Sequence, residues 1–152
     1  MMFLYLSLII GSLWFGIIQA KKLYLRVDFY KQFLDFLKAY SSNLSYKQDS
    51  ISDLIESYKK KHNNDFIRFI TDIKLNKFVQ LEYLKSEEAE EVKNIVAILG
   101  SSDIYTEEQK IKSIVNEVEE KHFECKNIKE KYSGLSIKLS FLIGVLLVIL
   151  LL

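Results

Sequence analysis

The chain has no proline, only 5 glycines and a single cysteine in 152 residues. A β-sandwich or a loop-rich enzyme needs turn residues, so their scarcity excludes both and favours long helices. One cysteine, Cys125, excludes an internal disulfide and a cysteine-based metal cluster. Charge of one sign is also missing, since 21 basic side chains face 20 acidic ones and the net charge is +1. This balance argues against a nucleic-acid-binding protein, which would carry a strongly basic face.

What the chain does have is an apolar run at each end. Phe3–Ala20 is mostly apolar and, as a helix, is close to the roughly 30 Å thickness of a bilayer core. Leu139–Leu152 carries no charge but spans only about 21 Å as a helix. Starting the helix at Gly134 gives about 28 Å, with the Lys138 ammonium reaching back to the interface. We therefore predict two membrane helices, over residues 1–20 and 134–152.

A cleaved signal peptide is the competing interpretation of the first run. Such a peptide has Lys or Arg before its apolar part, whereas nothing basic precedes Lys21 here, and the run is longer than usual. A retained membrane helix is therefore favoured. Basic residues adjoin both apolar runs on the side of the intervening segment, which places residues 21–133 in the cytoplasm by the positive-inside rule. The expected location is a cell membrane, with two spans and a cytoplasmic central domain.

Apolar residues in the central segment recur at three- and four-residue steps, which is typical of helices. The pattern predicts an all-α fold in which a membrane helix at each end flanks a small antiparallel helical bundle. The stripe from Leu23 to Leu44 continues the first membrane helix without a breaker. Further helices are expected from Ser50, around Phe66–Ile73, and from Ser86, the last ending at a left-handed Gly100. We also expect a helical patch at Phe78, Leu81 and Leu84, and a capping box at Thr106–Gln109.

No catalytic constellation stands out from these helices. His62 and His122 are far apart and lack a second ligand at metal spacing. His122 and Cys125 share a helix face, but a nucleophile pair also needs an orienting group and a pocket. The acidic cluster Glu87–Glu91 is explained by a solvated first helical turn, although a carboxylate pair for acid–base work stays open. We expect no enzymatic activity, no metal and no cofactor.

From Ile98 onward the sequence resembles the stage III sporulation protein AB family. The resemblance is carried by Ile98-Leu99-Gly100-Ser101-Ser102-Asp103, then Gln109, a Glu/Lys-rich helix, Lys131-Tyr132 and the Gly144-containing aliphatic tail. It implies a mother-cell membrane protein of endospore-forming bacteria. Proteins of this set build a secretion-like channel, or feeding tube, to the forespore. It also implies a cytoplasmic domain like the helical platform domain of type II secretion and type IV pilus systems.

The resemblance therefore implies a non-enzymatic membrane platform subunit in the mother-cell (outer forespore) membrane. Its expected partners are the bilayer, other stage III sporulation membrane subunits and a cytoplasmic secretion-type ATPase, but no nucleic acid. The residues matching the family pattern are candidates for a structural role or a partner contact: Gly100, Asp103, Gln109, Tyr132 and Gly144.

Three further expectations concern the candidate residues and the alternatives. Asp103 is expected to accept hydrogen bonds from loop amides, and Gln109 to complete a capping box. Gly11 and Gly144 are expected to let the two membrane helices approach closely. The alternative functions are a small membrane-active, holin-like protein and a membrane-bound enzyme using His122 and Cys125.

Overall fold

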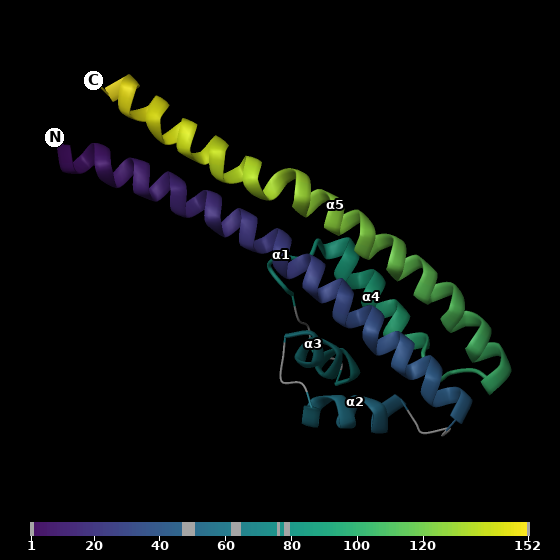
Figure 1. Cartoon of the computed structure of the whole chain (residues 1–152). Helices are drawn as coiled ribbons and strands as arrows, with labels where there is room; N and C mark the ends of the chain where they lie inside the picture. The colour runs from purple at the N-terminus through teal and green to yellow at the C-terminus, as the bar shows by residue number, and fades with distance from the viewer. Residues whose placement is uncertain (1, 47–50, 62–64, 76, 78–79, 152) are drawn as a thin grey trace. The chain divides into compact units, whose positions relative to one another are not determined.

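The computed structural model describes residues 2–46, 51–61, 65–75, 77 and 80–151, and these residues contain helices and no strand (Figure 1). This confirms the predicted all-α fold with apolar helices at the two ends. The helices labelled in Figure 1 have these bounds: α1 Met2–Tyr46, α2 Ile51–Lys61, α3 Asp65–Lys74, α4 Ser86–Ile98 and α5 Ile104–Leu151.

The chain forms two compact units. Unit 1 comprises Met1–Val27 and Phe123–Leu152, and unit 2 comprises Asp28–His122. Helices α1 and α5 therefore contribute residues to both units. The predicted boundaries at residues 20 and 134 mark where the apolar end segments meet the charged central segment. The boundaries of the two units instead follow contacts between residues.

Unit 1 is a pair of antiparallel helical segments. The Tyr5 hydroxyl donates to the Leu151 carbonyl at 3.4 Å, near the ends of the chain. Further along α1, the Lys129 ammonium lies 4.9 Å from the centre of the Tyr24 ring. These two contacts show that the segments run antiparallel and give the register of the pair.

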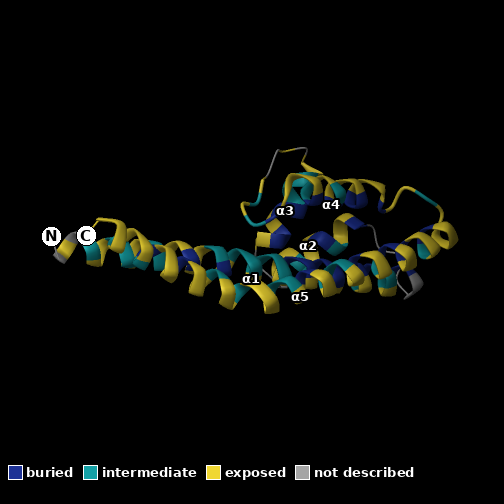
Figure 2. Ribbon diagram, turned by 90° about the horizontal axis from the view of Figure 1, so that it is seen from above, coloured by how far each residue is buried: buried dark blue, intermediate teal, exposed yellow. Residues whose placement is uncertain are grey.

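The outer surface of unit 1 is apolar along the parts of α1 and α5 that are nearest the two termini. Two helices, over Tyr5–Leu44 and Ile104–Leu151, are long and apolar enough to cross a membrane. Figure 2 colours their ends near the two termini mainly as exposed and intermediate. Large side chains there have no protein cover, among them Trp14, which is 67% exposed, and Leu150, which is 74% exposed. A soluble protein would bury such residues, so this surface supports membrane association.

Small residues hold the two segments of unit 1 close together. A Cβ atom added to Gly16 would lie 2.8 Å from Ser140 Oγ and 3.1 Å from Ile137 Cα. A Cβ atom added to Gly144 would overlap Ser12 Oγ. Gly11, in contrast, has nothing within 4 Å of an added Cβ atom. The expected contact at Gly144 is therefore present, but Gly16 rather than Gly11 supplies the second close approach.

Unit 2 is built around aromatic side chains of α1. The Phe29 ring meets Phe66 and Phe69 of α3 edge-on, at centroid distances of 5.4 and 5.5 Å. Phe66 also approaches Phe33 and Phe36 at 5.9 and 6.0 Å. Helices α2 and α3 contain 11 and 10 residues, too few to be stable alone in water. Their helical state depends on burying this cluster.

Several local expectations differ from the structure. The patch at Leu81 and Leu84 is not helical, although Leu84 is buried, because the chain turns there to reach α4. Lys85, not Ser86, is the cap of α4, and its backbone N–H donates to Glu88 Oε2 at 3.2 Å. The expected cap at Ser50, the loop at His62 and the patch residue Phe78 lie outside the described residues.

Replacing Phe66 with alanine should destabilise unit 2 by about 3–5 kcal/mol, because the change opens a cavity beside three aromatic rings. Phe123, 63% exposed, offers a matched control, and Phe123→Ala should stay within about 0.5 kcal/mol of the natural chain. The measurement is the urea dependence of hydrogen exchange at unit 2 amides in detergent-solubilised protein. Similar losses for the two variants would contradict the aromatic cluster as the core.

Substituting leucine at Gly16 or at Gly144 should separate the two segments of unit 1, because each side chain would meet the opposing helix. Gly11→Leu is the matched control, since its Cβ meets open space within 4 Å.

Cysteines introduced at positions 5 and 151, in a Cys125→Ala background, report the separation through their yield with a short bismaleimide crosslinker. We expect a severalfold loss of yield for the first two variants and none for the control. Equal yields in all three would show that the small residues do not set the helix spacing.

Candidate functional site

Three of the five candidate residues belong to unit 2, where Gly100 and Asp103 lie in the turn between α4 and α5 and Gln109 lies in α5. The other two, Tyr132 and Gly144, belong to unit 1. The residues of the α4–α5 turn therefore form one local site within unit 2.

Gly100 ends α4 in the left-handed conformation that the sequence predicts. Its φ angle is 79°, which a residue with a Cβ atom adopts only at a cost of about 1–2 kcal/mol. This conformation turns the Gly100 N–H toward α5, where it donates to Glu107 Oε1 at 2.6 Å. The glycine thus links the end of one helix to the first turns of the next.

Asp103 caps the start of α5. Its Oδ2 atom accepts from the Thr106 backbone N–H at 3.2 Å, and the first helical bond joins Glu107 N–H to the Asp103 carbonyl at 2.8 Å. The hydrogen bonds from Thr106 hold the pKa of Asp103 below its usual value. The helix begins at Ile104, so Thr106 lies inside it and the expected capping box at Thr106–Gln109 does not form. Gln109 is exposed.

Glu107 is the residue that the sequence analysis missed. Its side chain is 2% exposed, and its Oε1 atom accepts from the Tyr40 hydroxyl at 3.4 Å as well as from Gly100. Burial, followed by the charge of Glu107 and this hydrogen bond, raises the pKa of Tyr40 to about 12. The carboxylate therefore joins the α4–α5 turn to α1 within unit 2.

A signal for Glu107 was present in the sequence. The apolar stripe of α5 in unit 2 contains Ile111, Ile114 and Val118, all of which are buried. Extending that helical spacing one turn toward the N-terminus reaches Glu107. An acidic residue in line with a buried stripe indicates a buried carboxylate rather than a solvated cap.

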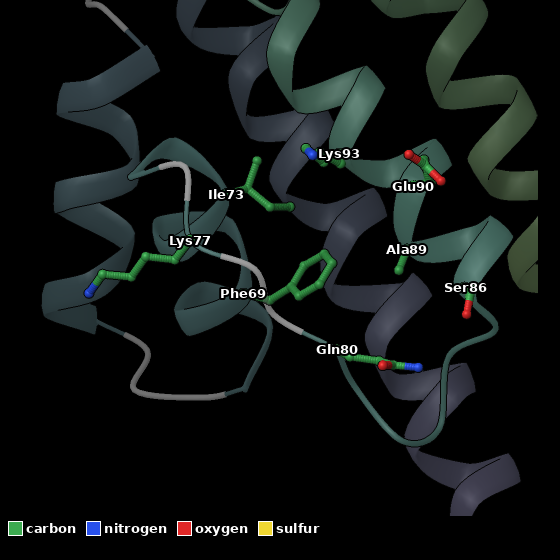
Figure 3. Close-up of a pocket in the computed structure, with 8 residues that line it drawn as sticks. All are labelled: Phe69, Ile73, Lys77, Gln80, Ser86, Ala89, Glu90 and Lys93. Atoms are coloured by element: carbon green, nitrogen blue, oxygen red, sulfur yellow. The ribbon is translucent and has the colours of Figure 1, made fainter.

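A groove between α3 and α4 is one of the concave features of unit 2 (Figure 3). Its volume is about 150 Å³, below the range of about 300–1,000 Å³ that is typical of small-molecule sites. Phe69 and Ile73 supply its apolar side, and Lys93 and Glu90 project from α4. The full lining is Phe69, Ile73, Lys77, Gln80, Ser86, Ala89, Glu90 and Lys93. Histidine and cysteine do not contribute to this lining.

The candidate catalytic groups do not assemble into a site within the described residues. Glu88 is buried against the cap of α4, and Glu91 lies 4.0 Å from the Lys121 ammonium. Cys125 is a buried cysteine of unit 1, and His122 belongs to unit 2. In the part of the chain that the structure describes, no group of three or more His, Cys, Asp or Glu side chains can hold a metal ion.

Tyr132 and Gly144 have different surroundings in unit 1. Tyr132 is 41% exposed, and the Lys131 ammonium lies 5.3 Å from its ring centre. Gly144 is buried and faces Ser12 and Ile9 of α1. Tyr132 is thus partly exposed, whereas Gly144 contributes to the close packing of the helix pair.

Comparison with known proteins gives one family. The sequence model of stage III sporulation protein AB matches residues 70–152, more than half of the chain. The match includes the α4–α5 turn and the apolar half of α5, and it confirms the resemblance inferred from the sequence. No curated protein and no solved structure shows a significant match.

Asp103→Ala should lower the melting temperature at neutral pH, because α5 loses its cap. Asp103→Asn is the matched control, since its amide oxygen can still accept from Thr106 N–H. The pKa of the natural carboxyl is lower in the folded chain than in the unfolded chain. Its stabilising effect is therefore complete above the unfolded pKa of about 4, and is lost as the pH falls through the folded value.

Melting curves recorded by circular dichroism between about pH 7 and about pH 2 test this cap. The Asn variant should melt with a weaker pH dependence than the natural chain. An unchanged melting temperature for Asp103→Ala, combined with loss of partner binding, would instead favour a role for Asp103 in partner contact.

Proposed function

The chain belongs to the stage III sporulation protein AB family, and from this we propose that it is a membrane platform subunit of the channel between mother cell and forespore. Family membership makes it a sporulation protein. The observation that carries the finer proposal is the combination of an apolar helix pair with a separate helical unit. The first provides an anchor, and the second provides a surface on which other proteins can assemble.

The proposed topology has two membrane spans and a cytoplasmic central domain. Lys21 and Lys22 follow the first apolar run, and Lys131 and Lys138 precede the second. Basic residues at both junctions favour the cytoplasm for the segment between them. The proposed limits are residues 1–20 and 134–152 for the spans and 21–133 for the cytoplasmic part. Both termini then lie at or beyond the opposite face of the mother-cell membrane.

The proposed activity is docking rather than catalysis. Some charged side chains at the surface of unit 2 form ion pairs, as in Lys38 with Glu119 at 3.3 Å and Lys112 with Glu108 at 3.1 Å. Exposed pairs of this kind contribute little to stability and suit contact with another protein. We propose a cytoplasmic secretion-type ATPase as the partner of unit 2 and the other stage III membrane subunits as partners of the complex.

Affinity purification of the tagged full-length chain from sporulating cells tests this function. The ATPase and neighbouring membrane subunits should co-purify with it, and should be absent when an unrelated two-span membrane protein is purified from the same cells at equal abundance. Recovery of the chain without these proteins, under conditions that preserve other membrane complexes, would contradict the proposal.

A membrane-active, holin-like function is the second candidate. It is favoured by the exposed apolar side chains along the end of α5, where Leu142 is 60% exposed. That function predicts growth arrest and dye entry when the chain is expressed in non-sporulating cells, whereas a platform subunit causes neither. A membrane-bound enzyme would instead lose function on alanine substitution at both His122 and Cys125.

A further inference from the structure

A cavity lies in unit 2 at the corner where α4 ends and α5 begins. Its volume is about 210 Å³, well above the roughly 15 Å³ that a single water molecule requires. Two of its lining residues come from α1 and one comes from α2. The other four come from the α4–α5 turn and the start of α5. The lining residues are Tyr40, Leu44, Ile51, Gly100, Ser102, Ile104 and Glu107.

The cavity contains a carboxylate with an unused acceptor atom. Glu107 Oε1 already accepts from Gly100 N–H and from the Tyr40 hydroxyl. The second oxygen, Oε2, is buried and has no hydrogen-bond partner among the described residues. Buried polar atoms are nearly always paired in native proteins, so an unpaired carboxylate oxygen beside a cavity indicates that the cavity accommodates a hydrogen-bond donor.

The charges near the cavity favour a cationic hydrogen-bond donor. Lys110 is the cation of this turn, and its ammonium donates to Ser102 Oγ. Its positive charge also acts on Asp103, where it helps to lower the pKa of that carboxyl. Lys110 thus acts on Ser102 and Asp103, whereas Glu107 has no ion pair among the described residues. A cationic donor is the natural complement of this site.

Large apolar side chains are exposed at the ends of the two helices that the α4–α5 turn joins. Ile98 and Ile104 are each 46% exposed and Tyr105 is 73% exposed, all three beside the same turn. Exposed apolar and aromatic residues around a buried charge are typical of contact surfaces between proteins. They make a macromolecular partner the favoured source of the donor.

We propose that this cavity receives a lysine side chain from a partner protein. The ammonium donates to Glu107 Oε2, while the aliphatic stem packs against Leu44, Ile51 and Ile104. Arginine fits less well because its guanidinium pairs with both oxygens of a carboxylate, and Oε1 is already occupied. The inference goes beyond the proposed channel role and does not depend on it, since it can be tested on the purified chain alone.

The probe is Nα-acetyl-lysine methylamide, a capped lysine, added to the full-length chain in a non-ionic detergent at constant ionic strength. The readout is the ¹⁵N and ¹H chemical shift of the Gly100 amide, which is bonded to Glu107. A saturable shift is expected. Capped norleucine has the same stem without the ammonium, so it should bind at least about tenfold more weakly, the factor that corresponds to 1.4 kcal/mol.

Two variants and one control separate an effect on binding from an effect on folding. Glu107→Gln should abolish the saturable shift, whereas Glu108→Gln, which changes an acid on the neighbouring position, should not. Ile104→Trp narrows the cavity without touching the carboxylate, and it should also abolish binding while the melting temperature is retained. This second variant keeps the test decisive if Glu107→Gln fails to fold.

Three results would overturn the proposal. These are no saturable shift in the natural chain, equal binding of capped lysine and capped norleucine, or unchanged binding in the Ile104→Trp variant. Spermidine distinguishes a free polyamine from a protein side chain. If spermidine displaces capped lysine and binds at least about tenfold more tightly than capped lysine does, the occupant is a polyamine and the partner-protein proposal is wrong.

Discussion

The buried Glu107 carboxylate is the interaction on which the organisation of unit 2 depends. It joins three segments, because it accepts from Gly100 at the end of α4 and from Tyr40 of α1 while itself lying in the first turns of α5. Removing a charged acceptor of this kind leaves its buried donors unpaired, which costs more than the bond itself contributes. The left-handed glycine, the Asp103 cap and the starting point of α5 all serve to place this one group.

The rest of unit 2 follows from the shortness of its middle helices. Helices α2 and α3 cannot stand alone, so the aromatic rings of α1 decide where they lie. Phe66 is central because it contacts rings on three successive turns of α1. Unit 2 consequently has an aromatic interior, to which both α1 and α3 contribute rings.

Sequence reasoning recovered the elements whose signals are local. The helical stripes located α1, α3, α4 and α5, and Gly100 was identified because left-handed geometry is a property of the residue itself. It failed where the outcome depends on neighbours distant in the chain. Leu84 is buried in a turn because other elements cover it, and Glu107 is buried because Tyr40, 67 residues away in sequence, donates to it. Gly16, not Gly11, meets α5 because register depends on both helices together.

Unit 1 combines two segments that are far apart in the sequence, and this affects when it can form during synthesis. Gly16 emerges early in synthesis, whereas Ser140, which it contacts, is added only after the whole of unit 2. At 5–20 residues per second, that interval is roughly 6–25 s. During this time the first apolar segment lacks the part of α5 against which it packs, so its small-residue face stays uncovered. Closure of the helix pair therefore has to wait until the apolar part of α5 has been made.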